Sequence, residues 1–246
     1  MNAPSQEASS AAHRFESTKW NIVSAAAKTG TEGVNRALEQ LCQIYWRPLY
    51  AFVRRRGHQP SDAKDLTQAF FARLLQRNFL RTVDPRKGKF RSFLLAAMEN
   101  FMAKEWRRSH AQKRGGGIVF SPLDDQMAEQ EYQQVPGHVL TPEKLFDRQW
   151  ALTLLQQVLT TLREEYMASD SGPLFDEIKI YLTVSRNEQG YAELAAKTGR
   201  SEAALKMAVS RMRKRYGEAL RAEIARTVHG PDEVAEEMRA LYAALS

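Results

Sequence analysis

The stretch YAELAAKTGRSEAALKMAVSR, at residues 191–211, decides how the C-terminal half of the chain folds. Ala195 is small where two helices must approach closely, and Gly199, four positions later, allows the positive φ angle of a tight turn. Ser201 is suited to cap a second helix. Three apolar side chains would form the small core between the helices: Leu194, Leu205 and Val209. The stretch therefore predicts a helix-turn-helix.

A helix-turn-helix inserts the N-terminal turns of its second helix into the major groove of duplex DNA. The leading residues of that helix can meet base edges: Arg200, Ser201, Glu202, Ala203 and Lys206. The residues that follow suit phosphates: Ser210, Arg211, Arg213 and Lys214. The alternative is an ordinary helix pair with a glycine turn, which the dense basic run over residues 211–215 disfavours.

Charge is distributed unevenly along the 246 residues, which carry 36 Lys+Arg and 29 Asp+Glu for a formal net charge of +7. Residues 47–114 hold 17 basic and 5 acidic side chains, residues 115–190 hold 5 and 12, and residues 191–229 hold 9 and 4. Two basic blocks separated by an acidic one point to two modules that bind a polyanion. An unevenly charged solvated surface is the alternative.

Helical periodicity dominates the chain, and the alternating patterns of strands are nearly absent. We therefore expect an all-α protein with two helical domains joined by a flexible linker. The expected parts are a partly disordered N-terminal extension (1–32), a first domain (33–114), an acidic linker (115–145), a helix-turn-helix domain (146–229) and an amphipathic tail (230–246). Pro122, Pro136 and Gly137 favour the linker assignment.

The first basic block contains two helical segments of interest. Asp62 and Asp65 open a helix with an apolar stripe, a pattern that a capped, dipole-matched helix start also explains. The helix expected from Phe90 to about His110 interleaves aromatic and basic side chains. Such a surface suits single-stranded DNA, because every base offers a face for stacking and every nucleotide a phosphate. The alternative is that these aromatic side chains belong to the core.

Taken together, these segments resemble the sigma-70 family of bacterial sigma factors, in its extracytoplasmic-function (ECF) type. DLTQAFF at residues 65–71 is similar to region 2.2, which docks on the clamp helices of the RNA polymerase β′ subunit. FRSFL at residues 90–94, with Asn100 and the Arg107–Arg108 pair, is similar to regions 2.3–2.4, which melt and bind the −10 element. The helix-turn-helix resembles region 4.2, which binds the −35 element. The resemblance covers about residues 33–114 and 146–228.

The resemblance implies roles for particular residues. For the core polymerase they are Asp62, Asp65, Leu66, Gln68 and Phe71. For the −10 element they are Arg86, Lys87, Phe90, Arg91, Phe93, Asn100, Lys104, Arg107 and Arg108. The implied partners are core RNA polymerase (β′ clamp helices and β flap) and promoter DNA, with room for an anti-sigma factor. Phe93 departs from the common tryptophan of the family and Lys104 from a frequent aspartate, and residues 168–178 and the tail beyond His229 are additions to the minimal pattern.

Two further classes of function compete with a sigma factor. A stand-alone helix-turn-helix regulator would bind duplex DNA as a dimer, with the tail over residues 234–245 as its dimerisation helix. An enzyme is not expected, because the five histidines show no metal-ligand spacing and no Gly-rich phosphate loop is present. The single cysteine, Cys42, suits a buried thiol in a reducing cytoplasm. We expect no metal, no cofactor, no secretory signal and no membrane insertion.

Overall fold

The computed structural model describes residues 31–74, 89–109, 125–135, 140–183, 188–226, 228 and 231–246. Over these residues the protein is all-α and contains no strand, as the sequence predicts. The helices of the first half are α2 (Thr31–Arg55), α3 (Pro60–Leu74), α5 (Phe90–Ser109) and α6 (Asp125–Gln133). Those of the second half are α7 (Pro142–Ala168), α8 (Gly172–Ile178), the 3-10 helix η2 (Lys179–Leu182), α9 (Glu188–Thr198), α10 (Glu202–Ala225) and α11 (Pro231–Leu245).

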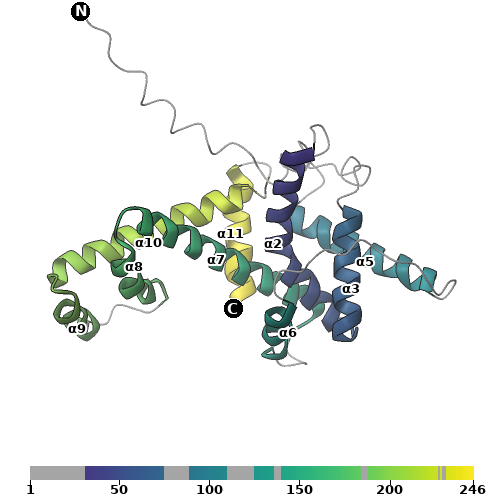
Figure 1. The fold of residues 1–246 in the computed structure, drawn as a ribbon, viewed down its shortest axis with the longest axis horizontal. Coiled ribbons are helices and arrows are strands. Elements are labelled where there is room, and N and C mark those ends of the chain that lie inside the picture. The colour runs from purple at the N-terminus through teal and green to yellow at the C-terminus, as the bar shows by residue number, and fades with distance from the viewer. Residues whose placement is uncertain are drawn as a thin grey trace, which may run out of the picture.

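The molecule is elongated, with α3 and α5 at one end and α9 at the other (Figure 1). Helix α2 lies at the centre of the first core and continues through Pro48. Large aromatic side chains fill this core: Tyr45, Phe52, Phe70, Phe71, Phe90, Phe146 and Trp150. A second, smaller core lies between the end of α7, α8, η2, α9 and the first half of α10. None of the described helices is long and apolar enough to span a membrane.

Helix α7 belongs to both cores. Thr141 caps it, with its side-chain oxygen accepting the Lys144 N–H at 3.3 Å. Trp150 and Leu154 then pack in the first core, whereas Leu162 packs in the second. The boundary expected at residue 146 therefore falls inside a helix whose first half completes the first core. The physical reason is that the first half of the apolar stripe of α7 is buried against α2.

Residues 125–133 of the expected flexible linker form helix α6, which docks on α2. The Glu129 carboxylate accepts hydrogen bonds from Tyr50 and from Arg54, whose Nε lies 2.9 Å away. Arg47 pairs with Glu131 at 2.9 Å. Here the structure differs from the sequence-based expectation, because acidic residues of the linker pair with the basic end of α2 instead of facing solvent.

The C-terminal tail is a helix, α11, that packs against both α7 and α10. Leu241 is fully buried, and Val234, Met238 and Leu245 pack against the first core. The apolar face of this tail is thus packed against other helices of the same chain.

Candidate nucleic-acid interface

The turn between α9 and α10 has the geometry that the sequence predicts. Gly199 adopts a φ of 66°, and its N–H donates to the Ala195 carbonyl at 3.0 Å. Ser201 caps α10 by accepting the Ala204 N–H at 3.3 Å. The predicted core between the two helices is buried: Leu194, Leu205 and Val209. A side chain at position 199 would have to enter the left-handed region, which explains the glycine.

The outer face of α10 is open to solvent. The exposed predicted residues are Arg200, Ser201, Glu202, Ala203, Lys206, Ser210, Arg211 and Lys214. The Lys206 ammonium lies 3.5 Å from the Glu202 carboxylate and 5.6 Å from the centroid of the Tyr191 ring. The Lys206–Glu202 ion pair lies at the surface, where such pairs are weak. A polyanion can therefore reach this face without a rearrangement of the surrounding helices.

Sequence reasoning missed Met207, which is 63% exposed on this face. It lies one helical turn after Ala203 and one before Arg211, so the three share one side of α10. That spacing is the signal that could have found it. An exposed methyl group at this place can contact the methyl group of thymine.

Arg213 does not belong to the open face, which corrects the sequence-based prediction. Its guanidinium points inward and donates from Nε to the Tyr181 carbonyl at 2.8 Å, with a second bond from Nη2. The carbonyl belongs to η2, so this arginine fastens η2 to α10. Arg211, two residues earlier, stays exposed because the helix turns by about 100° per residue.

At the other end of the molecule, α5 carries an exposed polar face. Asn100, Lys104 and Arg107 repeat at helical spacing, and all three are exposed. Trp106 is 64% exposed beside them. The prediction of a face that combines cations with an aromatic ring therefore holds for the second half of α5. Arg86 and Lys87 lie outside the described residues, as does the side chain of Arg108.

Phe90 is fully buried, which corrects its predicted role as a base-stacking residue. Its ring packs edge-on against Tyr45, with 5.4 Å between centroids. Phe93 is half-buried and packs against the same core, 6.1 Å from the Phe90 ring. The apolar stripe of α5 thus begins at its first residue, and Phe90 and Phe93 serve the core, which is the alternative that the sequence left open.

The predicted role of Arg91 in DNA binding is also corrected. Its side chain is only 13% exposed and forms ion pairs with two carboxylates. Its guanidinium donates to the carboxylates of Glu237 and Asp147 and lies 5.0 Å from the centroid of the Trp150 ring. Burial lowers the pKa of Arg91, but hydrogen bonds and charge from Glu237 outweigh it and raise the pKa above its usual value. The side chain is charged, and it cannot contact DNA in this arrangement.

The predicted polymerase-binding residues on α3 divide into two groups. Asp62 and Asp65 are exposed and Gln68 is half-buried, so their polar groups can meet a partner. Leu66 packs partly against the core, and Phe71 is buried, stacked on Trp46 with 5.9 Å between centroids. Phe71 is thus corrected to a core residue, since a partner could reach it only by opening α3 from α2.

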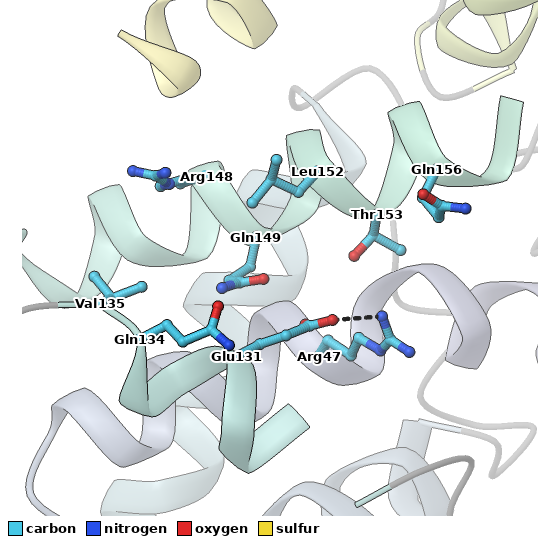
Figure 2. A pocket seen from close by; sticks show the side chains of 9 residues that line it. All are labelled: Arg47, Glu131, Gln134, Val135, Arg148, Gln149, Leu152, Thr153 and Gln156. Atoms are coloured by element: carbon cyan, nitrogen blue, oxygen red, sulfur yellow. Dashed lines mark hydrogen bonds and ion pairs between the residues drawn. The ribbon is translucent and has the colours of Figure 1, made fainter. Parts of the chain in front are cut away.

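A polar pocket of about 390 Å³ lies between α2, α6 and α7, away from both cationic faces (Figure 2). The Arg47–Glu131 ion pair closes one side of it. Gln149 of α7 and Gln134, just after α6, point toward one another across it. Among the described residues, no cluster of three His, Cys, Asp or Glu side chains could hold a metal ion.

Residues 41–112 match the family model of sigma-70 region 2. The matched segment contains most of α2 and all of α3 and α5. The match supports a sigma-70 family member, with core RNA polymerase and promoter DNA as partners in transcription initiation. Neither the comparison with curated proteins nor the comparison with solved structures returned a match.

Proposed function

We propose that this chain is an RNA polymerase sigma factor of the ECF type, which binds core enzyme and directs promoter recognition and initiation. The observation that carries the proposal is the sigma-70 region 2 match at residues 41–112 on a chain whose α10 presents an open cationic face. Its place of action is the cytoplasm. No covalent chemistry is needed, because binding energy shifts the DNA toward the melted state.

Helices α9 and α10 act in this proposal as the helix-turn-helix that binds the −35 duplex. The leading residues meet base edges: Arg200, Glu202, Ala203, Lys206 and Met207. The residues further along contact phosphates: Ser210, Arg211 and Lys214. The exposure of all of these side chains supports this division, because a base edge or a phosphate can be reached only by a solvent-facing group.

The exposed face of α5 binds the −10 element. Asn100, Lys104 and Arg107 supply one amide and two cations along a single helical face, and Trp106 offers an aromatic surface for a base. Stacking on such a ring contributes about 1–3 kcal/mol per base in proteins that bind single strands. On α3, the exposed Asp62 and Asp65 with Gln68 supply the contact to the β′ clamp helices, and the helix-turn-helix domain contacts the β flap.

A dimeric helix-turn-helix regulator is the competing proposal, and it needs α11 as its dimerisation helix. The apolar side chains that a dimer would use, such as Leu241 and Met238, pack against this chain's own core. That packing favours the sigma factor. Gel filtration with and without core polymerase separates the two, since a regulator would run as a dimer and ignore the enzyme.

Run-off transcription with purified core enzyme tests the proposal, on templates selected from a random library by the reconstituted holoenzyme. We expect a promoter-dependent product that weakens in Lys206→Ala. The matched control is Arg221→Gln, a surface cation on the same helix beyond the proposed DNA contacts. Absence of both a complex with core enzyme and a promoter-dependent product would refute the sigma-factor function.

A further inference from the structure

The C-terminal helix α11 reaches back to the start of α5 and holds two cations there. The Lys89 ammonium lies 2.9 Å from the Glu237 carboxylate and 2.8 Å from that of Glu236. Arg91 donates from Nε to one oxygen of Glu237 and from Nη2 to the other, the latter at 3.3 Å. Asp147 of α7 accepts a third bond from Arg91. The Arg91–Glu237 pair joins residues 146 positions apart in the chain.

The charge balance of this cluster opposes nucleic acid. Two cations, Lys89 and Arg91, face three carboxylates, those of Glu236, Glu237 and Asp147. With α11 in place, both cations are therefore engaged by carboxylates, which weakens their attraction for phosphate, although Arg239 of α11 also lies close enough to act on Glu236. With α11 removed, Lys89 would lose both carboxylate partners and Arg91 would keep Asp147 of α7, so positive charge would be released at the start of α5, the helix whose far end carries Lys104 and Arg107.

Glu237 makes the docking of α11 depend on those cations. Its side chain is only 2% exposed, on the same face of α11 as the buried Leu241 one turn later. A buried carboxylate that loses its partner is strongly destabilising. A ligand that takes Lys89 and Arg91 would leave Glu237 in this state, and α11 would detach.

We infer that α11 is an internal acidic competitor of DNA for the start of α5, so that DNA contact with Lys89 and Arg91 excludes the docking of α11. The inference rests on the proposed function in taking promoter DNA as the polyanion. Linkage makes the effect reciprocal: whatever weakens docking of α11 strengthens DNA binding by the same factor. The tail thereby sets how readily the −10 contact forms.

The test uses the full chain, with and without core polymerase, and a fluorescent fork-junction DNA. Glu237→Gln removes the charge while keeping the side-chain shape and one acceptor oxygen. Asp232→Asn is the matched control, since it removes an exposed charge from the same helix. Arg91→Gln and the double variant Arg91→Gln/Glu237→Gln complete a cycle, and thermal unfolding of each variant reports that it is folded.

We expect Glu237→Gln to bind the fork at least about fivefold more tightly, the lower end of typical coupling between sites. The dependence on salt should steepen, because about one or two additional phosphates are contacted. Asp232→Asn should change the affinity less than about twofold, as a distant screened charge does. The gain should shrink in the double variant, measured against Arg91→Gln alone, because Lys89 is then the cation that loss of the Glu237 charge still releases.

An unchanged affinity in folded Glu237→Gln would overturn the inference, as would a gain that is undiminished in the double variant. If Glu237→Gln does not fold, hydrogen exchange on the unaltered chain decides: the amides of α11 should exchange faster when fork DNA is added, and equal or slower exchange overturns the inference. A chain that ignores core polymerase while Glu237→Gln still gains DNA affinity would refute the sigma-factor function alone.

Discussion

At the α9–α10 end of the molecule, Arg200, Lys206 and Arg211 project into solvent, whereas at the start of α5 Arg91 is enclosed between Glu237 and Asp147. Both sites are basic residues near the first turns of long helices, and by charge alone they are equivalent. The two sites differ in the helices that pack next to them. Nothing among the described helices packs over the outer face of α10, while α11 and α7 pack over the start of α5.

The comparison teaches that a basic residue in a DNA-binding chain has two possible partners, the nucleic acid and the protein's own carboxylates. On α10 the cations are exposed, so a phosphate can reach them directly. At the other end they first serve the packing of α11, and DNA must compete for them. The two ends therefore differ in the free energy that must be supplied before a phosphate can bind.

The largest expected effect is on stability, at the buried tryptophan beneath the start of α5. Trp150→Ala should lower the free energy of unfolding by about 3–5 kcal/mol, as deletion of a buried large aromatic side chain does. Trp150 is 1% exposed and its ring lies beneath the Arg91 guanidinium. Denaturant titration followed by circular dichroism measures it. Leu152→Ala, on the same helix but 41% exposed, should cost less than about 1 kcal/mol. Equal losses would mean that α7 is not a shared element of the core.

The next effect separates two neighbouring arginines of the open end. Arg213→Gln should lower the free energy of unfolding by about 1–3 kcal/mol, because its hydrogen bonds to the Tyr181 carbonyl are lost. Arg211→Gln should leave stability unchanged and weaken binding to duplex DNA, with the logarithmic salt slope smaller by about 1 for one lost phosphate contact. Thermal unfolding and fluorescence anisotropy at several salt concentrations measure the pair. A reversed pattern would show that Arg213 rather than Arg211 faces the DNA.

A smaller effect probes the turn that holds the open end in shape. Gly199→Ala should destabilise the protein by about 1–2 kcal/mol, because a Cβ atom is unfavourable at a φ of 66°. Gly217→Ala is the matched substitution inside α10, where a Cβ would lie 3.5 Å from Arg221 in ordinary contact. It should stabilise the helix by up to about 1 kcal/mol. Shifts of the same sign in calorimetry would contradict the left-handed turn.

The smallest effect is a pH dependence of stability at the place where α6 docks on α2. Hydrogen bonds from Arg54 hold the pKa of Glu129 below its usual range, even though burial acts to raise it. A carboxylate with a lowered folded-state pKa stabilises the fold above its unfolded pKa of about 4.3, and this contribution is lost as the pH falls through the folded value. Wild type should therefore exceed Glu129→Gln in unfolding free energy by about 1 kcal/mol at neutral pH and lose this advantage in acid. A difference that is independent of pH would contradict it.

Much of the fold followed from local sequence signals. The cap at Ser201 and the turn at Gly199 lie where the sequence predicts them. The structure of the segment between the two halves did not follow from such signals. Proline, glycine and acidic residues indicated a flexible linker, yet residues 125–133 form a helix held by Arg54 and Tyr50. Composition cannot predict such docking, because it depends on a partner about 75 positions away.

The exposure of candidate site residues followed from helical spacing for Arg211, Lys104 and Asp65, whose roles remain predictions. It was predicted wrongly where an aromatic or basic residue also suited the core. Phe71 and Phe90 are buried, because their rings pack against Trp46 and Tyr45 of α2.

The sequence by itself determined the helices, their caps, the glycine turn and the two basic blocks, because each depends on side chains within a few residues of one another. Only the tertiary structure decided which cations are free to meet DNA. That choice depends on carboxylates brought from distant helices, as when Glu237 reaches Arg91. Pairing of this kind is determined by how helices pack, since the packing brings together charges that the linear order keeps apart.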